Sequence, residues 1–458
     1  MTTSAGLTAA LADFVVGMAE RPVPDAAAAV VRTGFIDTIA TMLAGRDEPV
    51  VGVVRGFVAA QAGPAGPEHR ARVLLGAETA RARDAALVNG TAGHALDYDD
   101  VALAGHPSTV LVPAVIAVAE QCGASGLDAL RAYVAGYEVW AELIGRDPDA
   151  HHLKGWHPTG VFGTVAAAAA TALLLRYDRA LTQRTLAIAA SMSAGLVANF
   201  GTMTKPFHAG QAAAHGIDAA MLARAGLTAA PDALEHHAGF LAALSPHNRV
   251  DRASPLPPLG ERLRITESGL SIKKYPVCYA THRVIDAVLD LAQAHDLAPQ
   301  DIERVDATIG VAQASMLRNA RPQTALEAKF SLQFAVASAL TARAVGLAQL
   351  DDGFVRQPQV QALFDRLRID TVDTEGPLGP AFARSDRVGI TLRDGRRLDS
   401  GEVAFARGDA HRPLAPEQLR DKFLDCARSV SFPQPERLFE QLSALQSLPR
   451  VSALAAHG

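Results

Sequence analysis

A helical repeat of apolar residues governs roughly the first 250 positions of this 458-residue chain. Apolar side chains recur at the three- and four-residue spacing of one helix face, beginning with Leu7, Leu11 and Phe14. Alanine and glycine are frequent inside these segments, and small side chains let helices approach closely. The longest apolar run, 161–175, is shorter than the ~20 residues of a membrane span, which predicts a buried helix. We expect an all-helical domain over residues 1–264.

The composition changes at the proline-rich segment 254–260. Beyond it, residues 302–311 and 388–392 alternate apolar and polar side chains, the pattern of a strand. An Arg-Asp-Gly-Arg turn at 393–396 then predicts a hairpin, with 401–405 as the partner strand. We expect a mainly α protein with a smaller α+β lid domain over 265–405. The other predicted helices cover 281–294, 325–344, 416–428 and 435–445, the last two in a C-terminal segment, 406–458, that packs back on the helical domain.

Charge and motif content exclude several classes of function. The net charge is −5, so no basic surface for nucleic acid is expected. The three cysteines are far apart, which gives neither a zinc motif nor a disulfide framework. The N-terminus lacks the basic segment of a signal peptide, so we expect a cytoplasmic protein without a membrane partner. The glycine-rich motifs of nucleotide and phosphate binding are absent, so no nucleotide cofactor is expected.

The first of four polar segments in this apolar sequence runs from Asn89 to Ser108. Asp97 and Asp100 are three residues apart and would share a face at the end of a helix. His106 follows on a Gly-His-Pro turn. A carboxylate near an imidazole is the basic unit of acid–base catalysis, although a helix end followed by a solvated loop would show the same pattern.

The other three segments add cations, imidazoles and a thiol. His157 precedes the long alanine-rich helix, and Lys205 precedes a proline, which predicts an extended backbone there. His208 follows on the next predicted helix. Lysines at 273 and 274 precede Cys278 at the mouth of a helix, where a thiol pKa is lowered. Together these groups predict cofactor-free chemistry next to a carboxylate: elimination of water, epimerisation or decarboxylation.

The four segments, in this order, resemble the MmgE/PrpD family. The resemblance rests on the strings His94-Ala-Leu-Asp-Tyr-Asp-Asp100, Trp156-His-Pro-Thr-Gly160, Thr204-Lys-Pro-Phe-His208 and Lys273-Lys-Tyr-Pro-Val-Cys278. It covers nearly the whole chain. It implies a helical domain closed by an α+β lid, a homodimer, and activities such as 2-methylcitrate dehydratase, cis-aconitate decarboxylase or iminodisuccinate epimerase. It implies no metal and no organic cofactor.

The resemblance also implies a set of site residues. Its catalytic members are Asp97, His106, His157, Lys205 and Lys273. We add Cys278 as a further catalytic candidate, and we expect substrate binding by Tyr98, Lys274, His208 and Arg321. Three positions depart from the decarboxylase branch: Val101 replaces a threonine, Cys278 a histidine, and 317–320 offer no tyrosine before Arg321. A thiol in place of the histidine would suit a two-base epimerase.

The preferred prediction is a lyase or isomerase similar to 2-methylcitrate dehydratase, acting on a small polycarboxylate that Lys205 and Lys273 bind together. Epimerisation and decarboxylation are its alternatives. A magnesium-dependent helical enzyme could instead use Asp97, Asp99 and Asp100 as ligands. A non-catalytic homologue is a third interpretation.

Overall fold

The computed structural model describes residues 6–63, 66, 68, 70–257, 259, 262–374, 376 and 382–454. The chain divides into a helical unit, 1–270 with 415–458, and a sheet unit, 271–414. These boundaries lie six and nine residues beyond the predicted 264 and 405. The proline-rich segment 254–260 therefore belongs to the helical unit; its residues 258 and 260 lie outside the described part.

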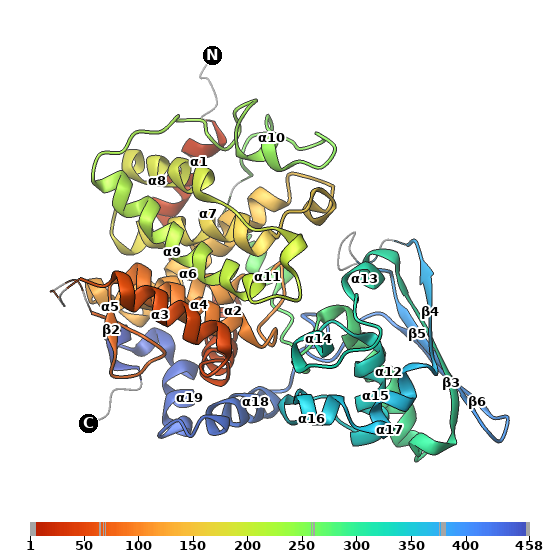
Figure 1. The fold of residues 1–458 in the computed structure, drawn as a ribbon. Helices are drawn as coiled ribbons and strands as arrows, with labels where there is room; N and C mark the ends of the chain where they lie inside the picture. Colours follow the sequence, from red (N-terminus) through yellow and green to blue (C-terminus); the bar gives the residue numbers. More distant parts are fainter. Residues whose placement is uncertain are drawn as a thin grey trace. The chain divides into compact units, whose positions relative to one another are not determined.

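The helical unit is built almost entirely from α-helices (Figure 1). Its helices are α1 (Leu7–Met18), α2 (Asp25–Ala44), α3 (Pro49–Gln61), α4 (Ala82–Ala95), α5 (Ser108–Cys122), α6 (Gly126–Ile144), α7 (Pro158–Leu174), α8 (Arg179–Met192), α9 (Thr204–Arg224), α10 (Phe240–Leu244), α11 (Arg264–Ser268), α18 (Pro416–Ser429) and α19 (Pro435–Ser443). The mainly α fold class is confirmed. The prediction of an all-helical first domain needs one correction, because Ala71–Arg72 (β1) and Thr79–Ala80 (β2) pair as a short antiparallel hairpin.

The alanine-rich helix α7 lies at the centre of this unit, and all 17 of its residues are buried, as predicted. It packs against α5, α6, α8 and α9, while α9 also packs against α4. Glycines make the α4–α9 contact close. A Cβ added at Gly210 would lie 2.1 Å from the Leu87 carbonyl oxygen, and one added at Gly90 would lie 2.8 Å from the Gly210 Cα. Only glycine fits such an approach without moving the backbone.

Helix α2 is long and apolar enough to cross a membrane by length and composition alone. Its most apolar window is 72% buried inside the protein. It packs against α4, α5 and α18, and it carries Asp37, a buried carboxylate paired with Lys422. These contacts are those of a core helix in a globular unit.

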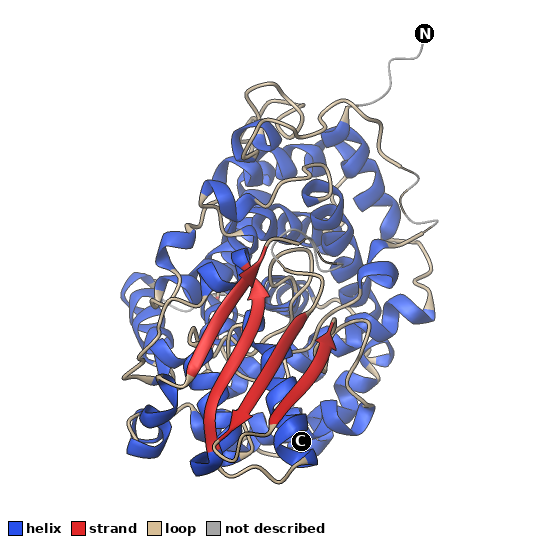
Figure 2. Cartoon of the chain, turned by 90° about the vertical axis from the view of Figure 1, so that its right-hand side faces the viewer, coloured by secondary structure: helices blue, strands red, loops and turns tan. Residues whose placement is uncertain are grey.

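In the part of the sheet unit that the structure describes, the strands are β3 (Ile302–Gly310), β4 (Leu367–Val372), β5 (Asp386–Leu392) and β6 (Arg397–Val403). They form one sheet, seen in Figure 2, in the order β4-β3-β5-β6. Strand β3 is parallel to β4 and antiparallel to β5, which forms a hairpin with β6. The predicted turn is present, with Gly395 at a φ of 88°. The partner strand begins at Arg397 rather than at 401. The edge strand β4 was not predicted.

The α-helices in the described part of the sheet unit are α12 (His282–Ala294), α13 (Val311–Met316), α14 (Ala325–Ala328), α15 (Leu332–Ala342), α16 (Asp352–Val355) and α17 (Pro358–Phe364). Helix α12 packs against β5 and β6, and one apolar core joins it to the sheet and to α15. The single helix predicted over 325–344 is wrong. Helix α14 ends at Ala328, and a second helix, α15, begins at Leu332. The Ser331 side chain caps the second helix by accepting a hydrogen bond from the Phe334 N–H.

Candidate active site

The backbone after α4 separates the three carboxylates predicted to act together. The helix ends at Ala95, and Asp97 adopts a left-handed conformation with a φ of 52°. Asp97 and Asp100 therefore do not share a helix face, which corrects the prediction. Asp residues tolerate this conformation better than most, but it still needs support from surrounding contacts. The turn sends the buried side chains of Asp97, Asp99 and Asp100 to different partners.

Lys205 and Asp97 form a buried ion pair at the start of α9. The Lys205 Nζ lies 2.5 Å from Asp97 Oδ1 and 3.1 Å from His94 Nε2. Lys205 is in the first helical turn, not in the predicted extended backbone, because Pro206 follows where a helix needs no N–H donor. A buried charge of this kind is stable only when it is paired. The pair holds an ammonium in place without exposing it to water.

Asp99 connects two imidazoles. Its carboxylate lies 2.9 Å from His94 Nδ1 and 3.2 Å from His106 Nδ1. Burial lowers the pKa of His94 to about 3, while the two imidazoles hold the pKa of Asp99 well below its usual range against the effect of burial. At neutral pH the carboxylate is therefore charged and His94 is neutral. Both Nδ1 atoms face acceptors, so Nε2 is the basic nitrogen of either ring when that ring carries a single proton.

His157 and His208 form a second imidazole pair. His157 is the residue immediately before α7, as predicted, and its Nδ1 lies 3.1 Å from His208 Nδ1. Burial and the charge of Lys205 lower the pKa of His157 well below its usual value and that of His208 to about 4. The rings of His94, His106 and His157 lie with centroids 4.4 to 6.4 Å apart. The Lys205 ammonium therefore lies among imidazoles that burial keeps neutral, those of His94, His157 and His208.

Two groups in the described part of the chain have donor atoms close enough to hold a metal ion: His94 with His106 and His157, and His94 with Asp97 and Asp99. Neutral imidazoles and carboxylates are suitable ligand types. However, both groups include a residue in contact with the Lys205 ammonium, so a metal cation would have to displace an existing cation. These residues fit a metal poorly while Lys205 is charged.

The predicted residues of the sheet unit are distributed differently. Lys273 and Cys278 are buried, and the Cys278 N–H donates to the Lys329 carbonyl. Lys274 lies beside the Tyr275 ring, and partial burial lowers its pKa. Arg321, by contrast, has a side chain that is 60% exposed and pairs with Asp365 on the surface. Within the sheet unit, Arg321 therefore has the contacts of a surface residue rather than of a buried anion site.

In the helical unit, the Tyr98 ring lies 3.8 Å from the Lys422 Nζ, and a role for Tyr98 in substrate binding stays a prediction. Sequence reasoning missed His94 as a site residue, although it contacts both Lys205 and Asp99. Its spacing of three and five residues from Asp97 and Asp99 was visible in the sequence.

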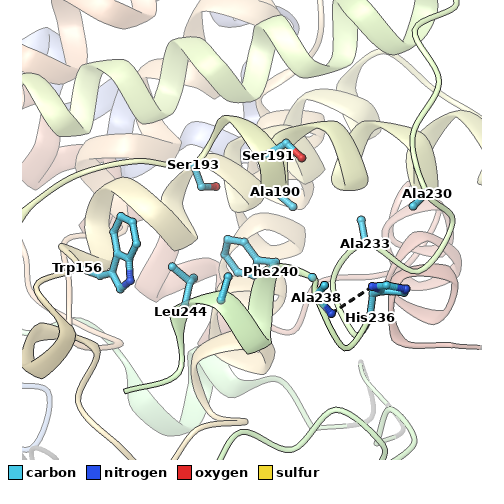
Figure 3. A pocket seen from close by; sticks show the side chains of 12 residues that line it. Trp156, Ala190, Ser191, Ser193, Ala230, Ala233, His236, Ala238, Phe240 and Leu244 are labelled. Carbon is cyan, nitrogen blue, oxygen red and sulfur yellow. Dashed lines mark hydrogen bonds between the residues drawn. The ribbon is translucent and has the colours of Figure 1, made fainter. Parts of the chain in front are cut away.

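A separate hollow of about 410 Å³ in the helical unit contains none of the predicted site residues (Figure 3). Its lining is largely apolar and includes Trp156, Phe240 and Leu244, with Ser191, Ser193 and His236 among its few polar groups. Trp156 directly precedes His157 in the chain. Among the described residues, the titratable group that lines this hollow is His236, and the Lys205–Asp97 pair lies outside it.

Two family comparisons cover most of the chain. Residues 9–253 match the MmgE/PrpD N-terminal domain, and residues 275–447 match the MmgE/PrpD C-terminal domain. The chain belongs to the MmgE/PrpD family. The N-terminal match contains Asp97, His106, His157 and Lys205, and the C-terminal match contains Cys278.

Curated members of the MmgE/PrpD family resemble this chain along most of its length. It is 30% identical to cis-aconitate decarboxylase of Mus musculus over 81% of this chain and 77% of that protein, and 30% identical to the Homo sapiens enzyme over 81% and 78%. The cis-aconitate decarboxylase of Aspergillus terreus is 25% identical over 76% and 75%. These relatives are lyases.

Proposed function

We propose that this MmgE/PrpD protein is a cofactor-independent lyase that acts next to a carboxylate of a small di- or tricarboxylic acid. The observation that carries the proposal is the buried Lys205–Asp97 pair surrounded by neutral imidazoles. An ammonium in a water-poor site stabilises negative charge far better than it does in water. The lowered pKa values keep His94, His157 and His208 neutral at physiological pH but also make them weak bases, so we assign the proton transfer to another histidine.

The same groups would serve either of two lyase reactions. In dehydration, a base removes a proton from the carbon beside a carboxylate, and hydroxide leaves with a proton from an acid. In decarboxylation, the C–C bond to the leaving carboxylate breaks, CO₂ departs, and the electron pair left on carbon takes up a proton. Both reactions pass through a species whose negative charge is delocalised into a carboxylate that remains on the substrate. Lys205 would stabilise that charge.

His106 is the best placed of the imidazoles to move the proton. Its side chain is 12% exposed, whereas His94 is fully buried. Asp99 and the Asp100 carbonyl orient its Nδ1, which leaves Nε2 as the basic atom. His94 then orients Lys205 by accepting a bond from its ammonium. We assign His106 as the proton carrier and His94 as a positioning residue.

The names of the relatives favour cis-aconitate as the first substrate to test, ahead of 2-methylcitrate. The departures at Val101, at Cys278 and before Arg321 keep dehydration and epimerisation as alternatives. Assigning Lys273 and Cys278 to the same substrate also remains a proposal. A Cys278→Ala variant with unchanged turnover on the true substrate would exclude an epimerase mechanism in which Cys278 is one of the two bases.

The test incubates the purified protein separately with cis-aconitate, 2-methylcitrate, citrate and iminodisuccinate in D₂O. Released CO₂, a dehydrated product or deuterium at carbon would identify the reaction. Lys205→Met should lower turnover by ~10²-fold or more, since a preorganised charge contact contributes about that factor. Lys154→Met is the matched control, because that exposed lysine donates to the backbone carbonyls of residues 243 and 245.

Two results would contradict the proposal. The first is a wild-type protein that changes none of these acids and incorporates no deuterium. The second is turnover that EDTA abolishes and magnesium restores, which would favour the metal-dependent alternative.

A further inference from the structure

A buried lysine from the C-terminal segment contacts the back of the candidate site. Lys422, on α18, has a side chain only 4% exposed. Its Nζ lies 2.6 Å from Asp37 Oδ1 on α2, donates to the Tyr98 carbonyl at 2.8 Å, and lies 3.8 Å from the centre of the Tyr98 ring. One ammonium thus joins α18, α2 and the segment that follows α4.

The Tyr98 carbonyl has a particular position in the site. It stands between Asp97, which pairs with Lys205, and Asp99, which orients His94 and His106. The backbone at Asp97 is left-handed, and such a conformation persists only where neighbouring contacts fix it. The bond from Lys422 fixes the peptide group between Tyr98 and Asp99, one residue beyond Asp97.

Charge gives Lys422 a second role. Asp37, Asp99 and Asp100 are all fully buried. Burial raises the pKa of Asp100 well above its usual value, and the charges of Asp37 and Asp99 raise it further. An ammonium beside Asp37 offsets part of this repulsion. Without Lys422, the Asp37 carboxylate beside the segment 97–100 would lose the cation that balances its charge.

We propose that Lys422 is a positioning residue for the candidate active site, acting through the Tyr98 carbonyl on the directions of Asp97 and Asp99. The effect on turnover rests on the proposed function. The effect on the imidazoles does not, because it is measured without a substrate.

A role confined to neutralising Asp37 is the competing explanation, and a double variant separates the two. In Lys422→Met, the charge balance and the carbonyl contact are both lost. In Asp37→Asn with Lys422→Met, the charge imbalance is removed but the Tyr98 carbonyl still lacks its donor. Arg428→Met is the matched control, because it removes an exposed cation of the same helix that pairs with Glu436.

The experiment measures urea unfolding, ¹⁵N signals of the histidine side chains, and kcat and KM on the substrate that the wild type turns over. We expect Lys422→Met to shift the imidazole signals of His94 and His106 and to lower kcat by ~10-fold or more, as loss of an orienting contact commonly does. The double variant should regain stability but neither the signals nor kcat. Arg428→Met should match the wild type.

Two outcomes would overturn the positioning role: wild-type imidazole signals in Lys422→Met, or full recovery of signals and kcat in the double variant. If Lys422→Met alone does not fold, the double variant still decides. If the wild type shows no turnover, the proposed function fails, while the imidazole signals still test the contact.

Discussion

Replacing Gly210 by alanine should separate α4 from α9 and disturb the Lys205–Asp97 pair. The new Cβ would lie 2.1 Å from the Leu87 carbonyl oxygen, whereas real Cβ atoms essentially never approach closer than 3.0 Å. The backbones must therefore move apart by about 0.9 Å. Overpacking of this kind destabilises proteins by about 1–3 kcal/mol. Lys205 is one and a half turns earlier on α9, so the same shift would stretch its 2.5 Å contact with Asp97.

The assay is urea unfolding followed by tryptophan fluorescence. Both tryptophans, Trp140 and Trp156, belong to the helical unit, so the signal reports on that unit. The matched control is Gly52→Ala on α3, where an added Cβ meets nothing within 4 Å. That change should stabilise the unit by about 0.5–1 kcal/mol, since alanine is the better helix former. If Gly210→Ala stabilises the protein as Gly52→Ala does, the close contact between α4 and α9 is wrong.

Three further predictions concern the candidate site and the thiols. Asp99→Asn should lower turnover by ~10²-fold with little change in KM, because both imidazoles lose the carboxylate that orients them; unchanged kcat would remove Asp99 from the site. The pKa of His208 is lowered to about 4 in the folded protein from an ordinary 6.5. Between these two pH values the imidazole is protonated in the unfolded chain but neutral in the folded protein, so the free energy of unfolding rises with pH in this range. His208→Gln should therefore reduce that slope in urea titrations at pH 4.5 to 7, and an equal slope would contradict the neutral buried pair. Finally, a thiol reagent should react first with exposed Cys122 and only after denaturation with buried Cys278 and Cys426, so Cys122→Ser should abolish the fast phase.

Much of the fold was accessible from periodicity. The helical repeat and the alanine-rich run predicted the helical unit and its buried α7, because small residues at helical spacing have few other stable arrangements. The turn at Gly395 and the strands beside it were also visible. The edge strand β4 was missed although Leu367 and Ile369 alternate with charged residues. The break between α14 and α15 depends on a single serine cap that periodicity does not reveal.

The site was only partly accessible, for a physical reason. The sequence identified which polar residues stand out against an apolar background, and Asp97, His106, His157, Lys205 and His208 do lie close together. It could not give the direction of each side chain, because that depends on one left-handed residue after α4. The role of Asp99 and the contribution of His94 follow from that turn. The surface ion pair between Arg321 and Asp365 likewise could not be predicted from the sequence.

The discontinuous helical unit has a consequence for the order of events during synthesis. Tyr98 and Lys422 are 324 residues apart, with the whole sheet unit between them. At the ~5–20 residues per second of translation, roughly 15 to 65 seconds pass between the two residues leaving the peptidyl-transferase centre. During that interval, Asp37 and the 97–100 segment have been synthesised but the Lys422 ammonium that contacts them has not. A nascent chain released within this interval would contain Asp37 and the 97–100 segment but not Lys422, so the contacts between them can form only after α18 has been synthesised.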